Sequence, residues 1–113
     1  MYFQHLYLIK LENEFESFYK IGTSVHRYCR FYQLMKHGYR ATIVYMLMKL
    51  DCHEAMNMEC KLHGLFKHYR PLIKFGGYTE CYKNIDIEEY KQHVNHLIPK
   101  SKEIVENLEI TWR

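Results

Sequence analysis

The residues that could do chemistry in this sequence lie along one predicted helix. Residues 51–69 repeat apolar side chains at helical spacing, and a second stripe runs along the edge of that apolar face: Glu59, His63, Phe66 and Arg70. A carboxylate at the margin of an apolar face is partly removed from water, where binding a metal or another ligand is worth most. Glu59 is therefore a candidate ligand. His63 beside it could bind phosphate or orient the carboxylate, the alternative being a partly buried structural histidine.

Standard catalytic motifs do not accompany this helix. The sequence has no phosphate-cradling glycine-rich loop, no H-E-x-x-H zinc motif and no nucleophile elbow. A zinc site can be drawn from Cys52, Cys60, His63 and Cys81. Structural zinc sites usually bring their ligands in tight pairs from turns, however, and the four cysteines include no C-x-x-C pair. Reduced thiols are therefore the preferred interpretation.

The elements that must position these residues alternate between strands and helices. The pattern predicts a hairpin of strands at 2–9 and 18–21, followed by a helix at 25–36 capped by Thr23 or Ser24. A buried strand at 42–50 leads into the helix at 51–69. After it come a loop at 72–78, a short strand at 80–83, and helices at 86–98 and 100–108 that Pro99 separates or kinks. This order predicts an α+β fold. Residues 1–83 would form a small domain with a short central antiparallel sheet flanked by helices. Residues 84–113 would form a C-terminal helical segment packed on the same domain.

Composition and charge limit the possible functions. The chain has 113 residues, of which 48% are apolar and 26% charged, as expected for one folded domain. No apolar run is long enough to cross a bilayer and no signal peptide is recognisable, so we expect an intracellular protein without a membrane partner. Residues 17–50 carry six basic residues and no carboxylate. This favours an anionic partner such as nucleic acid, the alternative being an ordinary solvated surface.

Around the predicted hairpin, four groups of residues follow in a recognisable order: Leu6-Tyr7-Leu8, Tyr19-Lys20-Ile21-Gly22, Arg30 and Glu59. In this order the sequence resembles the GIY-YIG nuclease superfamily, and more closely its branch from phages and large DNA viruses, whose second motif reads KIG. Tyr7 takes the place of the GIY tyrosine, although leucines flank it. Gly22 takes the place of the YIG glycine, and Arg30 follows it by the expected eight residues.

The resemblance continues to about residue 83. Ser24 stands where the family usually has Thr or Ser. Residues 59–66 are similar to the E-x-x-L-H-x-x-F pattern of the KIG branch, and Glu80-Cys81-Tyr82 is similar to its E-W-F segment, with Cys and Tyr replacing Trp and Phe. Lys20 replaces the second tyrosine of the wider family, so it cannot copy that tyrosine's neutral hydrogen bonding. It could instead supply positive charge beside Tyr7 or contact phosphate.

The resemblance implies a metal-dependent endonuclease that hydrolyses DNA phosphodiester bonds, including those of branched or structured DNA. Glu59 would hold a single Mg²⁺ or Mn²⁺ ion, and Tyr7 would orient or deprotonate the attacking water. Glu80 could join Glu59 as a ligand or hydrogen-bond the neighbouring catalytic groups. Arg30 would stabilise the charge that builds on the phosphate oxygens, assisted by Lys20. The candidate nucleic-acid contacts are Tyr19, Ser24, Arg27, Lys36, Arg40, His63 and Arg70. A viral protein of this kind would act in the cytoplasm or nucleus of the host cell.

Two alternatives from other classes stay open. The first is a nucleic-acid-binding module that keeps the fold with little or no turnover, as the replacement at Lys20 and the small size would allow. The second is a protein-interaction factor that forms a homo-oligomer through its C-terminal helix. The apolar residues of that helix could pack on the protein's own core or across a dimer: Ile85, Ile98, Leu108, Ile110 and Trp112.

Overall fold

The chain begins with the hairpin that its sequence predicts. Strands β1 (Phe3–Glu12) and β2 (Ser17–Ser24) pair antiparallel and are both longer than expected. The side-chain oxygen of Asn13 closes the turn, since it accepts hydrogen bonds from the backbone N–H groups of Phe15 (2.8 Å) and Glu16 (2.9 Å). The computed structural model describes residues 2–111 of the chain.

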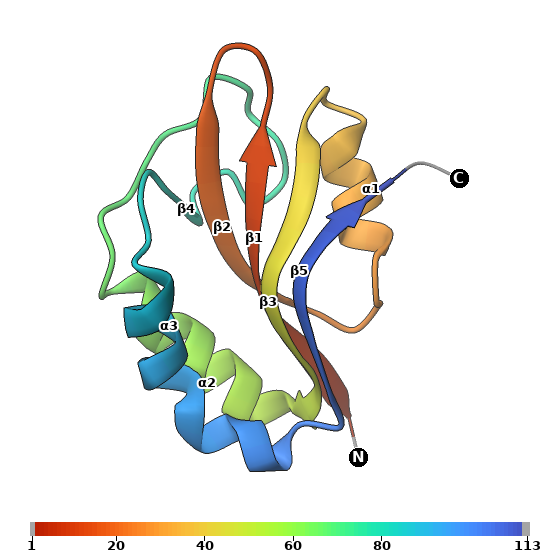
Figure 1. The fold of residues 1–113 in the computed structure, drawn as a ribbon, viewed down its shortest axis with the longest axis vertical. Helices are drawn as coiled ribbons and strands as arrows, with labels where there is room; N and C mark the ends of the chain where they lie inside the picture. The colour runs from red at the N-terminus through yellow and green to blue at the C-terminus, as the bar shows by residue number, and fades with distance from the viewer. Residues whose placement is uncertain (1, 112–113) are drawn as a thin grey trace.

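The hairpin is the centre of a five-stranded sheet (Figure 1). Strand β3 (Arg40–Asp51) pairs with β1, the two-residue strand β4 (Cys81–Tyr82) pairs with β2, and all pairs are antiparallel. The resulting order is β4-β2-β1-β3-β5. This confirms the α+β class with a central antiparallel sheet and flanking helices.

The predicted helix at 100–108 is wrong. This segment forms strand β5 (Glu103–Ile110), which pairs with β3 and completes the sheet. Its β-branched residues, including Val105 and Ile110, suit a pleated strand, and β3 supplies a row of backbone partners that a local pattern does not reveal. The C-terminal segment is therefore only partly helical. Trp112 lies outside the described residues.

The helices are shorter than predicted. Helix α1 (Cys29–Met35) starts late because Ser24 stays in β2, where its hydroxyl donates to the carbonyl of His26 (2.8 Å) instead of capping a helix. Helix α2 (Cys52–His63) is capped by the carboxylate of Asp51. It ends at His63, and the chain then turns back to the sheet, where the N–H of Tyr69 donates to the carbonyl of Cys81 (2.8 Å).

The C-terminal helical part consists of two short pieces. Helix α3 (Ile87–Val94) begins at the capping carboxylate of Asp86 and continues into a 3₁₀ helix, η1 (Asn95–Lys100). No helix within residues 2–111 is long and apolar enough to cross a membrane.

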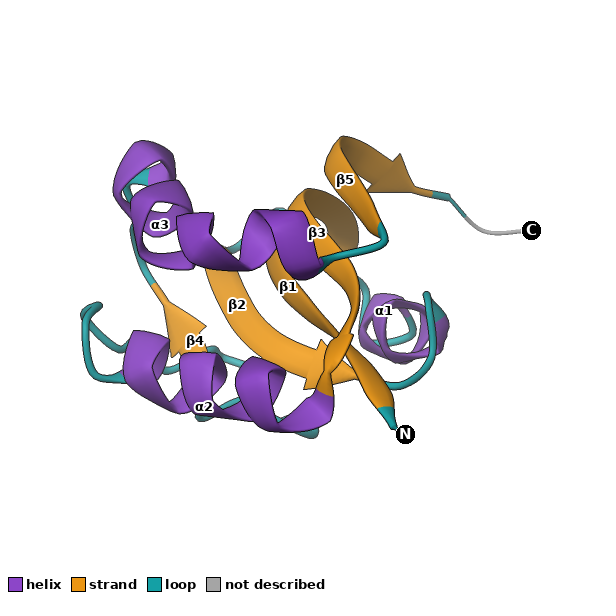
Figure 2. Cartoon of the chain, turned by 90° about the horizontal axis from the view of Figure 1, so that it is seen from below, coloured by secondary structure: helices purple, strands orange, loops and turns teal. Residues whose placement is uncertain are grey.

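Alternate residues of the sheet build two apolar clusters on its opposite faces. Tyr7, Ile9 and Leu11 pack with α1 and with Phe75. Leu6 and Leu8 pack with α2, α3 and η1. In Figure 2, α1 and α2 accordingly lie apart, with strands between them. A site that combines Tyr7, on the α1 face of the sheet, with residues of α2 must therefore reach around or through the sheet.

A buried carboxylate ties the hairpin to the segment that follows α2. Glu16 is 8% exposed and accepts hydrogen bonds from the hydroxyls of Tyr39 (2.5 Å) and Tyr69 (2.7 Å) and from the N–H of Leu72 (3.1 Å). Burial alone would raise the pKa of Glu16, but these hydrogen bonds outweigh it and lower the pKa. The same contact raises the pKa of Tyr69 to about 12. Residues 69–72 are thus held against the end of the hairpin.

Candidate active site

Tyr7 lies directly over a glycine of the neighbouring strand. It is the cross-strand partner of Gly22, and a Cβ atom at Gly22 would stand only 2.4 Å from the Tyr7 hydroxyl oxygen. The ring of Phe31 from α1 packs edge-on against Tyr7, with ring centroids 5.0 Å apart. The glycine is therefore required by the position of the tyrosine, which explains on steric grounds why these two residue types occur together here.

Lys20 is a fully buried cation that contacts this tyrosine. Its Nζ atom donates to the Tyr7 hydroxyl at 2.9 Å and lies 3.4 Å from Oε2 of Glu80. Burial alone would lower the pKa of Lys20, but the neighbouring oxygens of Tyr7 and Glu80 raise it. These contacts favour the ammonium form of Lys20, which donates to the tyrosine hydroxyl and attracts the carboxylate of Glu80.

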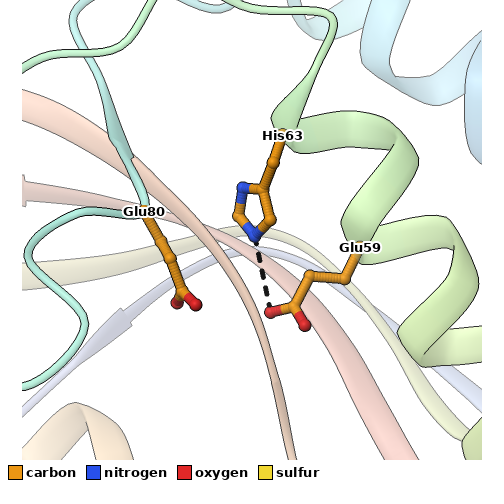
Figure 3. A group of neighbouring side chains, drawn as sticks. All are labelled: Glu59, His63 and Glu80. Atoms are coloured by element: carbon orange, nitrogen blue, oxygen red, sulfur yellow. Dashed lines mark ion pairs between the residues drawn. The ribbon is translucent and has the colours of Figure 1, made fainter.

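Glu80 joins this pair to the residues of α2. One ligand atom each from Glu59, His63 and Glu80 lies within 4.8 Å of the other two. Figure 3 shows the three side chains pointing toward one another, two from α2 and one from the residue before β4. The two carboxylates and the imidazole nitrogen are a donor set that suits a divalent cation. Within the described residues, the Cys52–Cys60–His63–Cys81 alternative is not found as a group.

His63 is oriented by a tyrosine of β4. Its Nδ1 atom is in hydrogen-bond contact with the hydroxyl of Tyr82, and the two rings are nearly parallel, with centroids 5.7 Å apart. Tyr82 is completely buried, and burial, followed by the nearby Glu80 and Cys81, raises its pKa. The tyrosine is therefore a neutral phenol that holds the imidazole ring with its other nitrogen toward Glu59.

Arg30 is not part of this chain of contacts within the described residues. It is exposed on α1 and lines a surface hollow together with Phe75 and Gly76. The next residue, Gly77, lies over Lys20: a Cβ atom there would stand 2.9 Å from Lys20 Cε. The turn at 75–80 thus covers the buried Tyr7–Lys20 pair and carries, at its surface, the hollow that Arg30 lines.

The other predicted nucleic-acid contacts come from several separate elements of the described residues. Arg27 forms an ion pair with Glu103 of β5, and Lys10 lies over the ring of Tyr19. Ser24 is used in its own turn with His26. The remaining exposed basic residues are Lys36 and Arg40 beside the α1–β3 connection and Arg70 in a hollow with Tyr78.

The sequence predicted Tyr7, Lys20, Arg30 and Glu59 as site residues, with Glu80 in a secondary role. It placed Tyr82 in a motif-like segment without assigning it a function. Glu80 connects the two halves of the arrangement, and Tyr82 orients His63. Their proximity could be predicted, because residues 80 and 82 are two apart in the predicted short strand and such residues point to the same face. The pairing of that strand with β2 was not visible.

Comparisons with protein-family models, with curated proteins and with solved structures give no match to this chain.

Proposed function

We propose that this protein is a metal-dependent endonuclease of the GIY-YIG type that hydrolyses phosphodiester bonds in DNA. One observation carries the proposal: Tyr7, Lys20, Glu80, Glu59 and His63 follow one another in a continuous series of close approaches, although they come from both faces of the sheet. A phenol, a fixed ammonium and paired carboxylates are the groups that phosphodiester hydrolysis needs.

Each residue has a role in this proposal. Glu59 and Glu80 hold a divalent ion, Mg²⁺ or Mn²⁺, which supplies positive charge to the phosphate oxygens. Tyr7 orients the attacking water through its hydroxyl oxygen. Lys20 positions the Tyr7 hydroxyl through the 2.9 Å hydrogen bond. Arg30, exposed beside the 75–80 turn, neutralises the charge that builds on the non-bridging oxygens.

Access to Tyr7 requires a movement of the protein. Tyr7 and Lys20 are both 0% exposed, and Gly77 of the 75–80 turn lies over Lys20. In the proposed reaction Gly77 moves away from Lys20 when DNA binds, while Glu80 stays beside Glu59 as a ligand of the ion. Motions of surface loops on the microsecond to millisecond scale commonly accompany substrate binding in enzymes.

The test is DNA cleavage by matched variants. Supercoiled plasmid and a branched DNA are incubated with the protein in Mg²⁺, in Mn²⁺ or in EDTA. We expect nicking that requires the ion, is lost in Glu59→Gln and Tyr7→Phe, and persists in Glu54→Gln. Glu54 is the matched control because it lies on the same helix and pairs at the surface with Lys100. Metal-dependent nicking by Glu59→Gln at the normal rate would contradict the proposal.

The burial of Tyr7 and Lys20 favours one second candidate, a nucleic-acid-binding module with little turnover. Such a module would bind the same DNA substrates in the presence of Mg²⁺ and leave them intact. Binding in either case should weaken steeply with added salt, because phosphate contacts release counterions. Binding and cleavage measured on the same DNA therefore separate the two candidates.

A further inference from the structure

One buried nitrogen in the candidate site approaches a carboxylate but makes no hydrogen bond. His63 Nε2 is buried and forms no hydrogen bond within the described part of the chain. The nearest carboxylate oxygen, Oε2 of Glu59, is 3.6 Å away, just beyond hydrogen-bonding distance. A buried polar atom without a hydrogen bond destabilises a fold unless something else binds it, and this atom faces two carboxylates.

The other side of the imidazole explains why Nε2 is the nitrogen without a hydrogen bond. The hydroxyl of Tyr82 contacts Nδ1, and Tyr82 is itself fixed in β4, where it pairs with Tyr19 of β2. An imidazole that binds a metal through Nε2 carries its proton on Nδ1, and the Tyr82 oxygen is placed to accept that hydrogen bond. The ring is therefore already oriented for coordination through Nε2.

The spacing of the donor atoms fits a small divalent ion. Ligand atoms about 2.0–2.2 Å from such an ion stand roughly 3–4.4 Å from one another. Here the donor atoms of Glu59, His63 and Glu80 lie within 4.8 Å of one another, and the Glu59–His63 pair is at 3.6 Å. Shifts of a few tenths of an ångström would bring all three into coordination.

We infer that His63 is a direct ligand of the ion, together with Glu59 and Glu80, and that the site consequently prefers a first-row transition-metal ion such as Mn²⁺ to Mg²⁺. The inference rests on the metal site of the proposed function but not on its activity. Mg²⁺ prefers oxygen ligands, whereas an imidazole nitrogen adds affinity for first-row transition ions. The histidine is thus the residue that sets metal selectivity.

The experiment measures ion binding directly, without DNA. Mn²⁺ and Mg²⁺ are titrated into the full chain by calorimetry, and the bound Mn²⁺ is examined by pulsed electron paramagnetic resonance. We expect one Mn²⁺ per chain, bound at least about tenfold more tightly than Mg²⁺, with a ¹⁴N coupling from the imidazole. His63→Gln should remove the nitrogen coupling and the preference for Mn²⁺, while Mg²⁺ affinity changes by less than about threefold.

Two further variants refine the test. Tyr82→Phe removes only the hydroxyl that orients His63, so Mn²⁺ affinity should fall by about tenfold while the nitrogen coupling persists. His53→Gln is the matched control, because this exposed histidine lies at the start of the same helix, and it should leave Mn²⁺ binding unchanged.

The outcomes separate this inference from the proposed function. Wild-type protein that binds Mn²⁺ without nitrogen coupling, or that binds Mg²⁺ as tightly as Mn²⁺, overturns the inference even if DNA is cleaved. This readout on the wild type also decides the matter if His63→Gln does not fold. Histidine-dependent Mn²⁺ binding without any cleavage supports the inference and contradicts the nuclease.

Discussion

Gly22→Ala is the most direct perturbation of the Tyr7–Gly22 arrangement. The new methyl group would stand 2.4 Å from the Tyr7 hydroxyl oxygen and 2.6 Å from Cζ, far below the roughly 3.5–4.0 Å of normal contact. Tyr7 has little room to retreat, since it is 0% exposed and packed against Phe31. Overpacking of this kind costs about 1–3 kcal/mol, whereas the reduced freedom of alanine in the unfolded chain returns only about 0.4–1 kcal/mol. The clash therefore dominates.

We expect a net loss of about 1–2 kcal/mol in the free energy of unfolding. For 113 residues, an unfolding entropy of about 2.1 cal/mol/K per residue converts this to a melting temperature lowered by roughly 4–8 °C. Differential scanning calorimetry measures it. Gly76→Ala is the control, since an added Cβ there meets nothing within 4 Å. The steric reasoning is refuted if Gly22→Ala has the melting temperature of the wild type. It is also refuted if the penalty is not reduced in a Tyr7→Leu background, where both the hydroxyl oxygen and Cζ are gone.

Three other predictions test separate features. The folded pKa of Glu16 is lowered, so its carboxylate stabilises the protein above the unfolded pKa of about 4.3, and this stabilisation is lost as the pH falls through the folded pKa. Glu16→Gln should lower the free energy of unfolding at pH 7 by about 1–3 kcal/mol, measured by chemical denaturation. The difference in stability between the variant and the wild type should disappear in acid. Lys20→Met should abolish cleavage but shift the melting temperature by only a few degrees. An apolar side chain suits this buried site, and the partly exposed Glu80 can turn to solvent. A much larger drop in melting temperature would contradict this reasoning. Truncation after Ser101 removes β5 and should prevent cooperative folding as followed by circular dichroism, whereas normal melting of the shortened chain would show that β5 is dispensable.

The local parts of the fold could be predicted from the sequence. Two apolar blocks separated by a polar segment predicted the hairpin, and Asp51 marked the start of α2. What failed depended on distant partners. Residues 103–110 carry a pattern compatible with either helix or strand, and only the free edge of β3 decides for a strand. The end of α2 at His63 depends likewise on Tyr69 pairing with Cys81, residues that are far apart in the sequence.

The candidate site was predictable to a similar degree. Glu59 and His63 share a helix stripe, so their approach follows from local geometry. Tyr7 and Lys20 lie in the two strands of one hairpin, whose register brings them together. The distance from Lys20 to Glu80 spans sixty residues and is fixed by the pairing of β2 with β4. Local sequence spacing therefore cannot predict this contact.

The shortness of β4 affects which part of the protein can open locally. This strand contributes two residues to the sheet, whereas β1, β2, β3 and β5 each contribute eight or more. Small units with few ladder bonds open at free energies well below that of global unfolding. The turn that precedes β4 can therefore open while Cys81 and Tyr82, both completely buried in the apolar clusters, stay in the sheet. Each such opening would carry Gly77 away from Lys20, uncovering the ammonium while the rest of the molecule keeps its shape.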